Sequence, residues 1–128
     1  MDDNEKGLTF GQYLQKRRSE LGISMRKFAE QVGHSAQYQS DIEWGSRSVP
    51  ERELLDKIIK ALKLTTEEER FAYDLAASER GQGTIAQDTT NYIRENPIVV
   101  RALRTAKDAG AGVAEWEAFI AECEKKNK

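Results

Sequence analysis

The chain has 128 residues, 38% of them hydrophobic, which is enough for one domain with an appendage and a core that needs no cross-links. Its formal net charge is −2, from 20 basic and 22 acidic residues, so it is not a protein that coats nucleic acid through a uniformly basic surface. The single cysteine, Cys123, excludes an internal disulfide, and no apolar run approaches the length of a membrane span.

Residues 1–8 are predicted to form a loose tail. They are acidic and polar, unlike a secretory signal, so we expect a cytoplasmic protein. Thr9 suits the cap of a helix running to about Leu21, whose inward side is Phe10, Tyr13, Leu14 and Leu21. For the basic pair Lys16 and Arg17 on this helix, a solvated face and a functional role both remain open.

A second helix is predicted over residues 25–32. Ser24 can cap it, because its hydroxyl can accept from a free backbone N–H one turn on. Gly33 follows the last apolar position, where a residue with positive φ ends a helix without a steric penalty. The apolar face has the spacing i, i+3, i+4 and i+7, from Met25, Phe28, Ala29 and Val32.

A third helix follows at once, capped by Ser35 and ended by Gly45. Its large apolar groups are only Tyr38 and Ile42, four residues apart. The other positions are mostly short or planar hydrogen-bonding groups, so this helix is too polar for a core element. It suits a surface that is read by hydrogen bonds.

The loop at 46–50 leads to a fourth helix, which Pro50 is predicted to start. Its apolar stripe runs from Leu54 to Leu62, whereas Lys57 and Lys60 are predicted to be solvated. Thr66–Glu69 has the spacing of a capping box, opening a fifth helix through about Ala77.

Glycine and polar residues around position 81 indicate a linker at 80–95, with a short helical turn near Tyr92. Two amphipathic helices follow. Asn96 is predicted to cap the first, with Pro97 at its first helical position, and the second covers roughly 112–125. Their apolar sides must be buried against something. They either fold back on the first domain or form a dimer or partner interface, and we favour a dimer. Cys123 lies on the apolar side and is predicted to be buried.

The pair of helices at 25–32 and 36–44, with small Ala29 at their crossing and Gly33 in the turn, has the spacing of a helix-turn-helix. In this the chain resembles the lambda-repressor-like, or Xre-type, regulators. The resemblance covers roughly residues 9–77 and rests on Leu14, Arg18, Gly22-Ile23-Ser24, Phe28-Ala29, Val32-Gly33, Ser35, Ile42-Glu43, Gly45 and Pro50.

The resemblance implies that the helix at 36–44 enters the major groove of DNA while the helix at 25–32 crosses the phosphate backbone. Gln37 is the best candidate for a specific contact, because its amide can pair with N7 and N6 of adenine at once. Asp41 would accept from cytosine N4 or repel wrong positions. For any single position, a solvent-exposed side chain without a role remains the alternative. The expected DNA contacts are Ser24, Met25, Arg26, Ser35, Ala36, Gln37, Tyr38, Ser40, Asp41, Trp44, Ser46 and Arg47.

The same resemblance implies an ion pair between Arg18 and Glu43 that ties the first helix to the end of the third. Three residues depart from the family pattern. Gln39 occupies a usually aliphatic position and His34 a turn position that is often small. They either loosen the packing of the helix at 36–44 or bond locally to backbone, and we favour local bonds. Trp44 either covers the core or lays its ring on the sugar-phosphate backbone.

The sequence therefore predicts an all-α protein: a five-helix lambda-repressor-like domain at 9–79, a linker at 80–95 and a helical extension at 96–128. We expect a sequence-specific regulator of transcription, a repressor, that binds a double-stranded operator as a homodimer. The alternative is an antitoxin or other protein-interaction module with a toxin partner. No cofactor, metal or enzymatic activity is expected, because the only histidine and the only cysteine are far apart and no Gly-rich phosphate loop is present.

Overall fold

The computed structural model describes residues 3–81 and 84–127, and all its regular structure there is helical, which confirms the all-α prediction. Residues 1–2 of the expected tail, 82–83 of the expected linker and Lys128 of the extension lie outside the described residues. The chain divides into two compact units, Met1–Thr90 and Asn91–Lys128.

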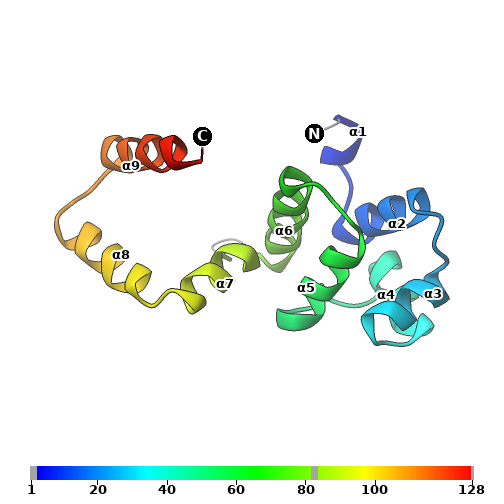
Figure 1. Ribbon diagram of the computed structural model, residues 1–128. Helices are drawn as coiled ribbons and strands as arrows, with labels where there is room; N and C mark the ends of the chain where they lie inside the picture. The colour runs from blue at the N-terminus through cyan, green and yellow to red at the C-terminus, as the bar shows by residue number, and fades with distance from the viewer. Residues whose placement is uncertain (1–2, 82–83, 128) are drawn as a thin grey trace. The chain divides into compact units, whose positions relative to one another are not determined.

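Five helices build the core of the N-terminal unit (Figure 1). The unit also contains α1 (Asp3–Lys6) and the first residues of α7 (Gln87–Glu95), so the expected count of five helices is too low for it. The core helices are α2 (Phe10–Glu20), α3 (Met25–Val32), α4 (Ala36–Trp44), α5 (Arg52–Ala61) and α6 (Thr66–Arg80).

The hydrophobic core draws on all five of these helices. Most of the predicted inward positions of α2, α3 and α5 are buried, because their spacing of three and four residues places them on one side of each helix. Met25 of α3 and Leu54 of α5 are only half-buried. Leu21 is an exception: it follows the end of α2 and is exposed. The core residues buried to 1% exposure or less include Phe10, Tyr13, Leu14, Phe28, Leu55, Ile58, Ile59, Ala72 and Ala76.

Three helix starts differ from the sequence prediction. Helix α8 (Ile98–Asp108) begins one residue after Pro97, and Asn96 does not cap it, because the Asn96 side chain donates to the Tyr92 carbonyl at 2.9 Å. The capping box of α6 uses Thr65 and Glu68, because Thr65 has extended backbone and its hydroxyl accepts from the Glu68 N–H at 3.2 Å. Thr66 is the first helical residue instead. Helix α5 begins at Arg52 rather than at Pro50, which lies buried in the preceding loop, where its carbonyl accepts from Arg80.

The segment before Thr9 is not the predicted loose tail where it is described. Residues 3–6 form α1, and the buried side chain of Glu5 accepts from Lys16 Nζ at 3.1 Å and lies 3.5 Å from an Arg17 nitrogen. Arg17 also contacts Glu68 at 2.7 Å. The basic pair 16–17 is therefore held by carboxylates and is not a freely solvated face, although both side chains remain partly exposed.

The predicted linker at 80–95 is also partly built into the N-terminal unit. The buried Gln87 side chain accepts from the Arg52 backbone N–H at 2.7 Å and donates to Asp56 at 3.0 Å. The hydroxyl of Tyr73 donates to the same carboxylate at 2.6 Å. These bonds fasten the start of α7 to α5 and α6, so the division between the units falls at 90–91.

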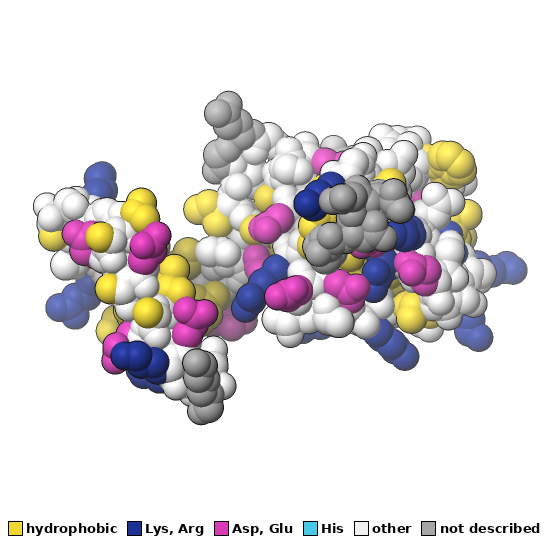
Figure 2. All heavy atoms as spheres, turned by 90° about the horizontal axis from the view of Figure 1, so that it is seen from above, with side chains coloured by type: hydrophobic (Ala, Val, Ile, Leu, Met, Phe, Trp, Pro, Cys, Tyr) yellow, Lys and Arg dark blue, Asp and Glu magenta, His cyan; other side chains and the backbone are white. Residues whose placement is uncertain are grey.

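The C-terminal unit contains the two predicted amphipathic helices, α8 (Ile98–Asp108) and α9 (Val113–Lys126). None of their residues is buried, and Cys123, predicted to be buried, is only half-buried. Figure 2 shows hydrophobic side chains at the surface of this unit, among acidic and basic ones. The large exposed apolar residues of α8 and α9 are Ile98, Leu103, Val113, Trp116, Phe119 and Ile120. Within the described ranges, no helix is long and apolar enough to span a membrane.

Candidate nucleic-acid interface

Helices α3 and α4 form a helix-turn-helix whose joints are the predicted caps. The Ser24 hydroxyl accepts from the Lys27 N–H at 3.1 Å, and the Ser35 hydroxyl accepts from the Tyr38 N–H at 3.0 Å. Gly33 ends α3 with φ at +89°, a left-handed conformation that a side chain would strain. Local chemistry thus fixes both ends of the turn.

The two sides of α4 differ sharply. Its inner side is buried against the core by Gln39, Ile42 and Glu43. On the outer side, the predicted contacts Ser35, Ala36 and Gln37 are exposed, and Ser40, Asp41 and Tyr38 are half-exposed. The helix therefore presents its first two turns to solvent.

A buried ion pair anchors the end of α4 to α2. Arg18 Nε donates to Glu43 Oε2 at 2.7 Å and Arg18 NH2 donates to Glu43 Oε1 at 2.9 Å, the two-pronged geometry that guanidinium and carboxylate prefer. Arg18 NH1 also donates to the Ile23 carbonyl at 2.6 Å. The structure thus places Arg18 and Glu43 in direct contact. Arg18 also binds the loop before α3 through the carbonyl of Ile23.

The prediction that Gln39 bonds to backbone is wrong. Its side chain is fully buried, and Nε2 donates to Glu43 Oε2 at 2.7 Å. Gln39 therefore adds a hydrogen bond to the carboxylate of the Arg18–Glu43 ion pair. The reason is its position on the inner side of α4, one turn before Glu43. His34 does bond locally, through Nδ1 to the Ser35 carbonyl at 3.1 Å, and its ring lies 4.9 Å from that of Tyr38.

The predicted base-reading and phosphate-binding groups contact one another. Gln37 Nε2 donates to Asp41 Oδ1 at 2.9 Å. Arg47, from the loop after α4, points back to this helix: its NH2 lies 3.6 Å from Asp41 Oδ2 and its guanidinium lies 4.4 Å from the Tyr38 ring centroid. The spacing of four residues between Gln37 and Asp41 allows their contact on a helix, but local patterns do not predict the part played by Arg47, because its direction depends on the loop.

Trp44 is 72% exposed, which excludes the alternative that it covers the core. It borders a groove that also includes Arg47 and Ser48 of the following loop and Thr9 and Gln12 at the start of α2. At the start of α3, Ser24 and Arg26 are exposed and Met25 is half-buried. Ser46 is exposed in the loop after α4. An exposed indole beside a cation suits a sugar-phosphate surface.

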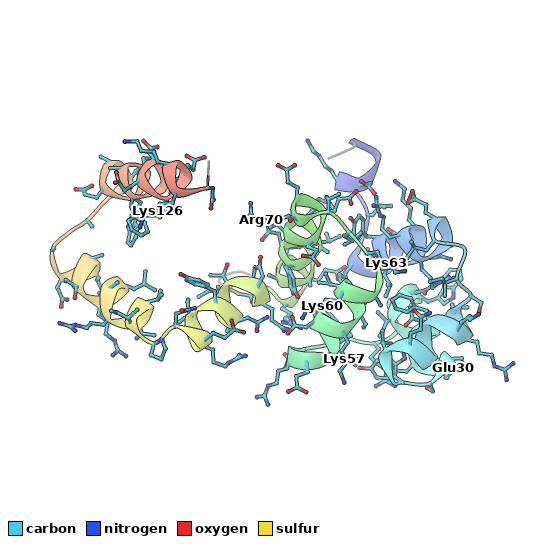
Figure 3. The ribbon with its side chains drawn as sticks, viewed as in Figure 1. Glu30, Lys57, Lys60, Lys63, Arg70 and Lys126 are labelled. Carbon is cyan, nitrogen blue, oxygen red and sulfur yellow. The ribbon has the colours of Figure 1, made fainter. Side chains whose placement is uncertain are left out.

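Other exposed cations lie outside the helix-turn-helix. Lys57 and Lys60 are exposed along α5, as predicted, and Lys63 follows in the turn toward α6 (Figure 3). Among the described residues, no cluster of histidine, cysteine and carboxylate side chains has the arrangement of a metal site.

A comparison with protein families supports this geometry. The helix-turn-helix domain family matches residues 9–72, 64 of the 128 residues. No curated protein sequence matches the chain. One solved structure, titled SinR protein/SinI protein complex, is similar over 93% of this chain and 98% of its own, with 19% identity and a TM-score of 0.45, too weak a likeness to bear on function.

The family match covers the capped turn, the ion-pair partners and the outward face of α4 together. It is the assignment that the resemblance to Xre-type regulators predicts. The chain belongs to the helix-turn-helix domain family of DNA-binding regulators.

Proposed function

We propose that this protein is a sequence-specific, double-stranded DNA-binding repressor of transcription that reads its operator with α4. The observation that carries the proposal is the two-sided character of this helix. Its inner side is locked to the core through Glu43 and Gln39, whereas Ala36 and Gln37 stand exposed at its start. A rigidly held helix with a polar outer side suits the major groove, where base edges offer a distinct set of donors and acceptors.

The elements on either side of α4 suit the phosphate backbone. Ser24 and Arg26 stand at the start of α3, where backbone N–H groups at a helix N-terminus favour anions. Trp44 lies at the C-terminal end of α4, and Ser46 and Arg47 lie in the loop that follows it. Since the whole chain has a net charge of −2, affinity must come from such local contacts and from fit.

Homodimer formation through residues 96–128 completes the proposal. Large apolar side chains on α8 and α9 are exposed, and such faces are stable in water only when a partner covers them. The charges of the two helices are complementary. Basic residues dominate α8 (Arg101, Arg104 and Lys107 against Asp108), and acidic residues dominate α9 (Glu115, Glu117, Glu122 and Glu124 against Lys125 and Lys126). In a dimer, the acidic α9 of each copy can therefore pair with the basic α8 of the other copy, so that each contact occurs twice, as two-fold symmetry requires.

The same exposed faces support a second candidate, a protein-interaction module such as an antitoxin that covers them with a toxin. The two candidates differ in stoichiometry. Sedimentation of the purified chain as a dimer favours the homodimer. A monomer that forms a one-to-one complex with the product of an adjacent gene favours the second candidate.

The central test is selection of bound fragments from random duplexes, followed by sequencing. We expect an enriched palindrome with half-sites about 10 base pairs apart, which would establish register and symmetry together. Gln37→Ala should then weaken operator binding by about 1–3 kcal/mol and relax one base position in each half-site. Gln31→Ala, the same change at an exposed position of α3, is the matched control.

Two results would contradict the proposal. One is a selection from which no sequence emerges at moderate salt. The other is an enriched operator that Gln37→Ala binds as tightly and as selectively as the original chain does, because α4 then cannot be the element that reads it.

A further inference from the structure

The carboxylate of Asp41 is already occupied on both oxygens. Oδ1 accepts a hydrogen bond from Gln37 Nε2 at 2.9 Å, and Oδ2 lies 3.6 Å from Arg47 NH2. The side chain is only 25% exposed. Asp41 therefore directs Oδ1 at Gln37 and Oδ2 at Arg47, and three quarters of its side chain is shielded from solvent, although it lies one helical turn after the exposed Gln37.

The first bond fixes the orientation of the Gln37 amide. An amide can turn by 180° about its last torsion, which exchanges its oxygen and nitrogen. Beside the Asp41 carboxylate only one orientation is favourable, because Nε2 donates to it, whereas the reversed amide would place Oε1 against a negative charge. One N–H of Gln37 is thereby used, and one N–H and Oε1 remain available.

The remaining groups suit one purine and not the other. In the major groove, adenine presents the N7 acceptor beside the N6 donor, whereas guanine presents two acceptors, N7 and O6. An amide with one free N–H and one free oxygen can satisfy both adenine groups. Against guanine, its oxygen faces the O6 acceptor. An unrestrained amide does not have this limit, since both of its N–H groups are available.

Arg47 makes the carboxylate compatible with DNA. An isolated negative charge on α4 would be repelled by the phosphate backbone. The guanidinium of Arg47 lies 4.4 Å from the centroid of the Tyr38 ring, a cation–π geometry that holds it on α4 beside Asp41. The pair is close to neutral, so Asp41 can orient Gln37 without opposing the approach of DNA.

From these contacts we propose that Asp41 is a specificity-determining positioning residue, with Arg47 as its counterion, which makes Gln37 a reader of adenine in preference to guanine. This inference rests on the proposed DNA binding through α4 and deepens it: it assigns the base class to Gln37 and removes Asp41 from the set of direct base contacts.

The test is random-duplex selection and competition binding with the full-length chain and three variants: Asp41→Ala, Gln37→Ala and the double variant. The original chain should prefer adenine over guanine at one position of each half-site. Asp41→Ala should lower that preference at least about fivefold, since one well-formed pair of bonds to a base corresponds to roughly that discrimination or more. The double variant should match Gln37→Ala in base preference, because Asp41 acts through Gln37.

Asp74→Ala, which removes an exposed carboxylate from α6, controls for the loss of one negative charge and should leave the preference unchanged. Circular dichroism shows whether each variant folds. If Asp41→Ala does not fold, Asp41→Ser replaces it, because the shorter hydroxyl cannot reach Gln37.

Two outcomes overturn the inference while leaving DNA binding intact. In one, the original chain selects an operator and Asp41→Ala keeps the same preference for adenine over guanine. In the other, Asp41→Ala alters a different base position and its effect adds to that of Gln37→Ala, as for a direct contact. If the original chain selects no sequence, the proposed function itself fails, and the inference fails with it.

Discussion

Gly11 of α2 passes so close to Ile42 of α4 that a Cβ atom on Gly11 would lie 2.3 Å from the Ile42 carbonyl oxygen. No real Cβ atom is found at such a distance from a backbone oxygen. The first helix of the domain and the helix that we propose reads DNA therefore meet backbone to backbone, and only glycine permits the approach.

Gly11→Ala is expected to destabilise the protein by about 1–3 kcal/mol, since overpacking at a rigid backbone contact forces the helices apart. Helix propensity alone predicts the opposite sign, a gain of about 1 kcal/mol. Thermal unfolding decides between the two. Gly7→Ala is the matched control, because nothing lies within 4 Å of a Cβ atom at that position. An unchanged melting temperature for Gly11→Ala would show that α2 and α4 do not cross as described.

The Arg18–Glu43 pair is the next test of how α4 is held. Either Arg18→Ala or Glu43→Ala should lower the free energy of unfolding by about 3–5 kcal/mol, because each leaves the other charge buried without its partner. The double variant should lose clearly less than the sum of the two. Arg70→Ala removes an exposed arginine from α6 and is the control (Figure 3). Simple additivity in denaturant unfolding would mean that the two side chains are not coupled.

Tyr13 gives a prediction at alkaline pH. Burial raises the pKa of Tyr13 to about 12, with nearby Glu5 and Glu68 adding to the effect and Arg17 opposing it. Its buried hydroxyl oxygen has no hydrogen-bond partner among the described residues. The folded pKa lies above the unfolded value of about 10, so this group's contribution to stability is full below about pH 10 and is lost as the pH rises toward 12.

Tyr13→Phe should therefore stabilise the protein by about 1 kcal/mol near neutral pH, because an unpaired buried hydroxyl is removed. Its unfolding free energy should also fall less steeply than that of the original chain between about pH 10 and 12. Urea unfolding across this range measures both effects. Tyr92→Phe, at an exposed tyrosine, is the control. A destabilised Tyr13→Phe would indicate that the hydroxyl has a partner.

Arg47 is expected to act on affinity through charge as well as through Asp41. Its side chain is half-exposed, so a phosphate can approach it from the side that faces away from α4. Arg47→Ala should weaken binding to all duplexes and reduce the slope of log affinity against log salt by about one. Lys60→Ala, on the exposed side of α5, should leave the slope as it is. Equal slopes for the Arg47 variant and the original chain would exclude a phosphate contact.

The C-terminal unit yields a prediction about assembly. Ile120→Lys places a charge on the exposed apolar face of α9, beside Trp116 and Phe119, and should shift a dimer toward monomer in sedimentation equilibrium. Ala118→Lys introduces the same side chain on the opposite side of the helix and should leave the dimer intact. A chain that is monomeric at high micromolar concentration before any substitution would contradict the dimer itself.

Local sequence patterns were enough to predict much of this protein. Ser24, Gly33 and Ser35 define the turn of the helix-turn-helix, because caps and positive-φ glycines act within a few residues of themselves. Periodicity identified the buried faces of α2, α3 and α5 for the same reason. The resemblance to Xre-type regulators supplied the Arg18–Glu43 pair, which local patterns do not reach.

Other features were decided only in the tertiary structure. Gln39 is buried because it faces Glu43 beneath α4, and Gln87 because it pairs with Arg52, 35 residues earlier. The direction of Arg47 depends on the loop that carries it, and the need for glycine at position 11 depends on a helix crossing. Such contacts join residues that are distant in sequence or set by a loop, and periods of three and four residues carry no information about them. Local patterns were therefore sufficient for the helices from α2 onward and for most of their apolar sides, whereas α1 was not predicted, and the contacts between polar groups far apart in sequence depend on packing.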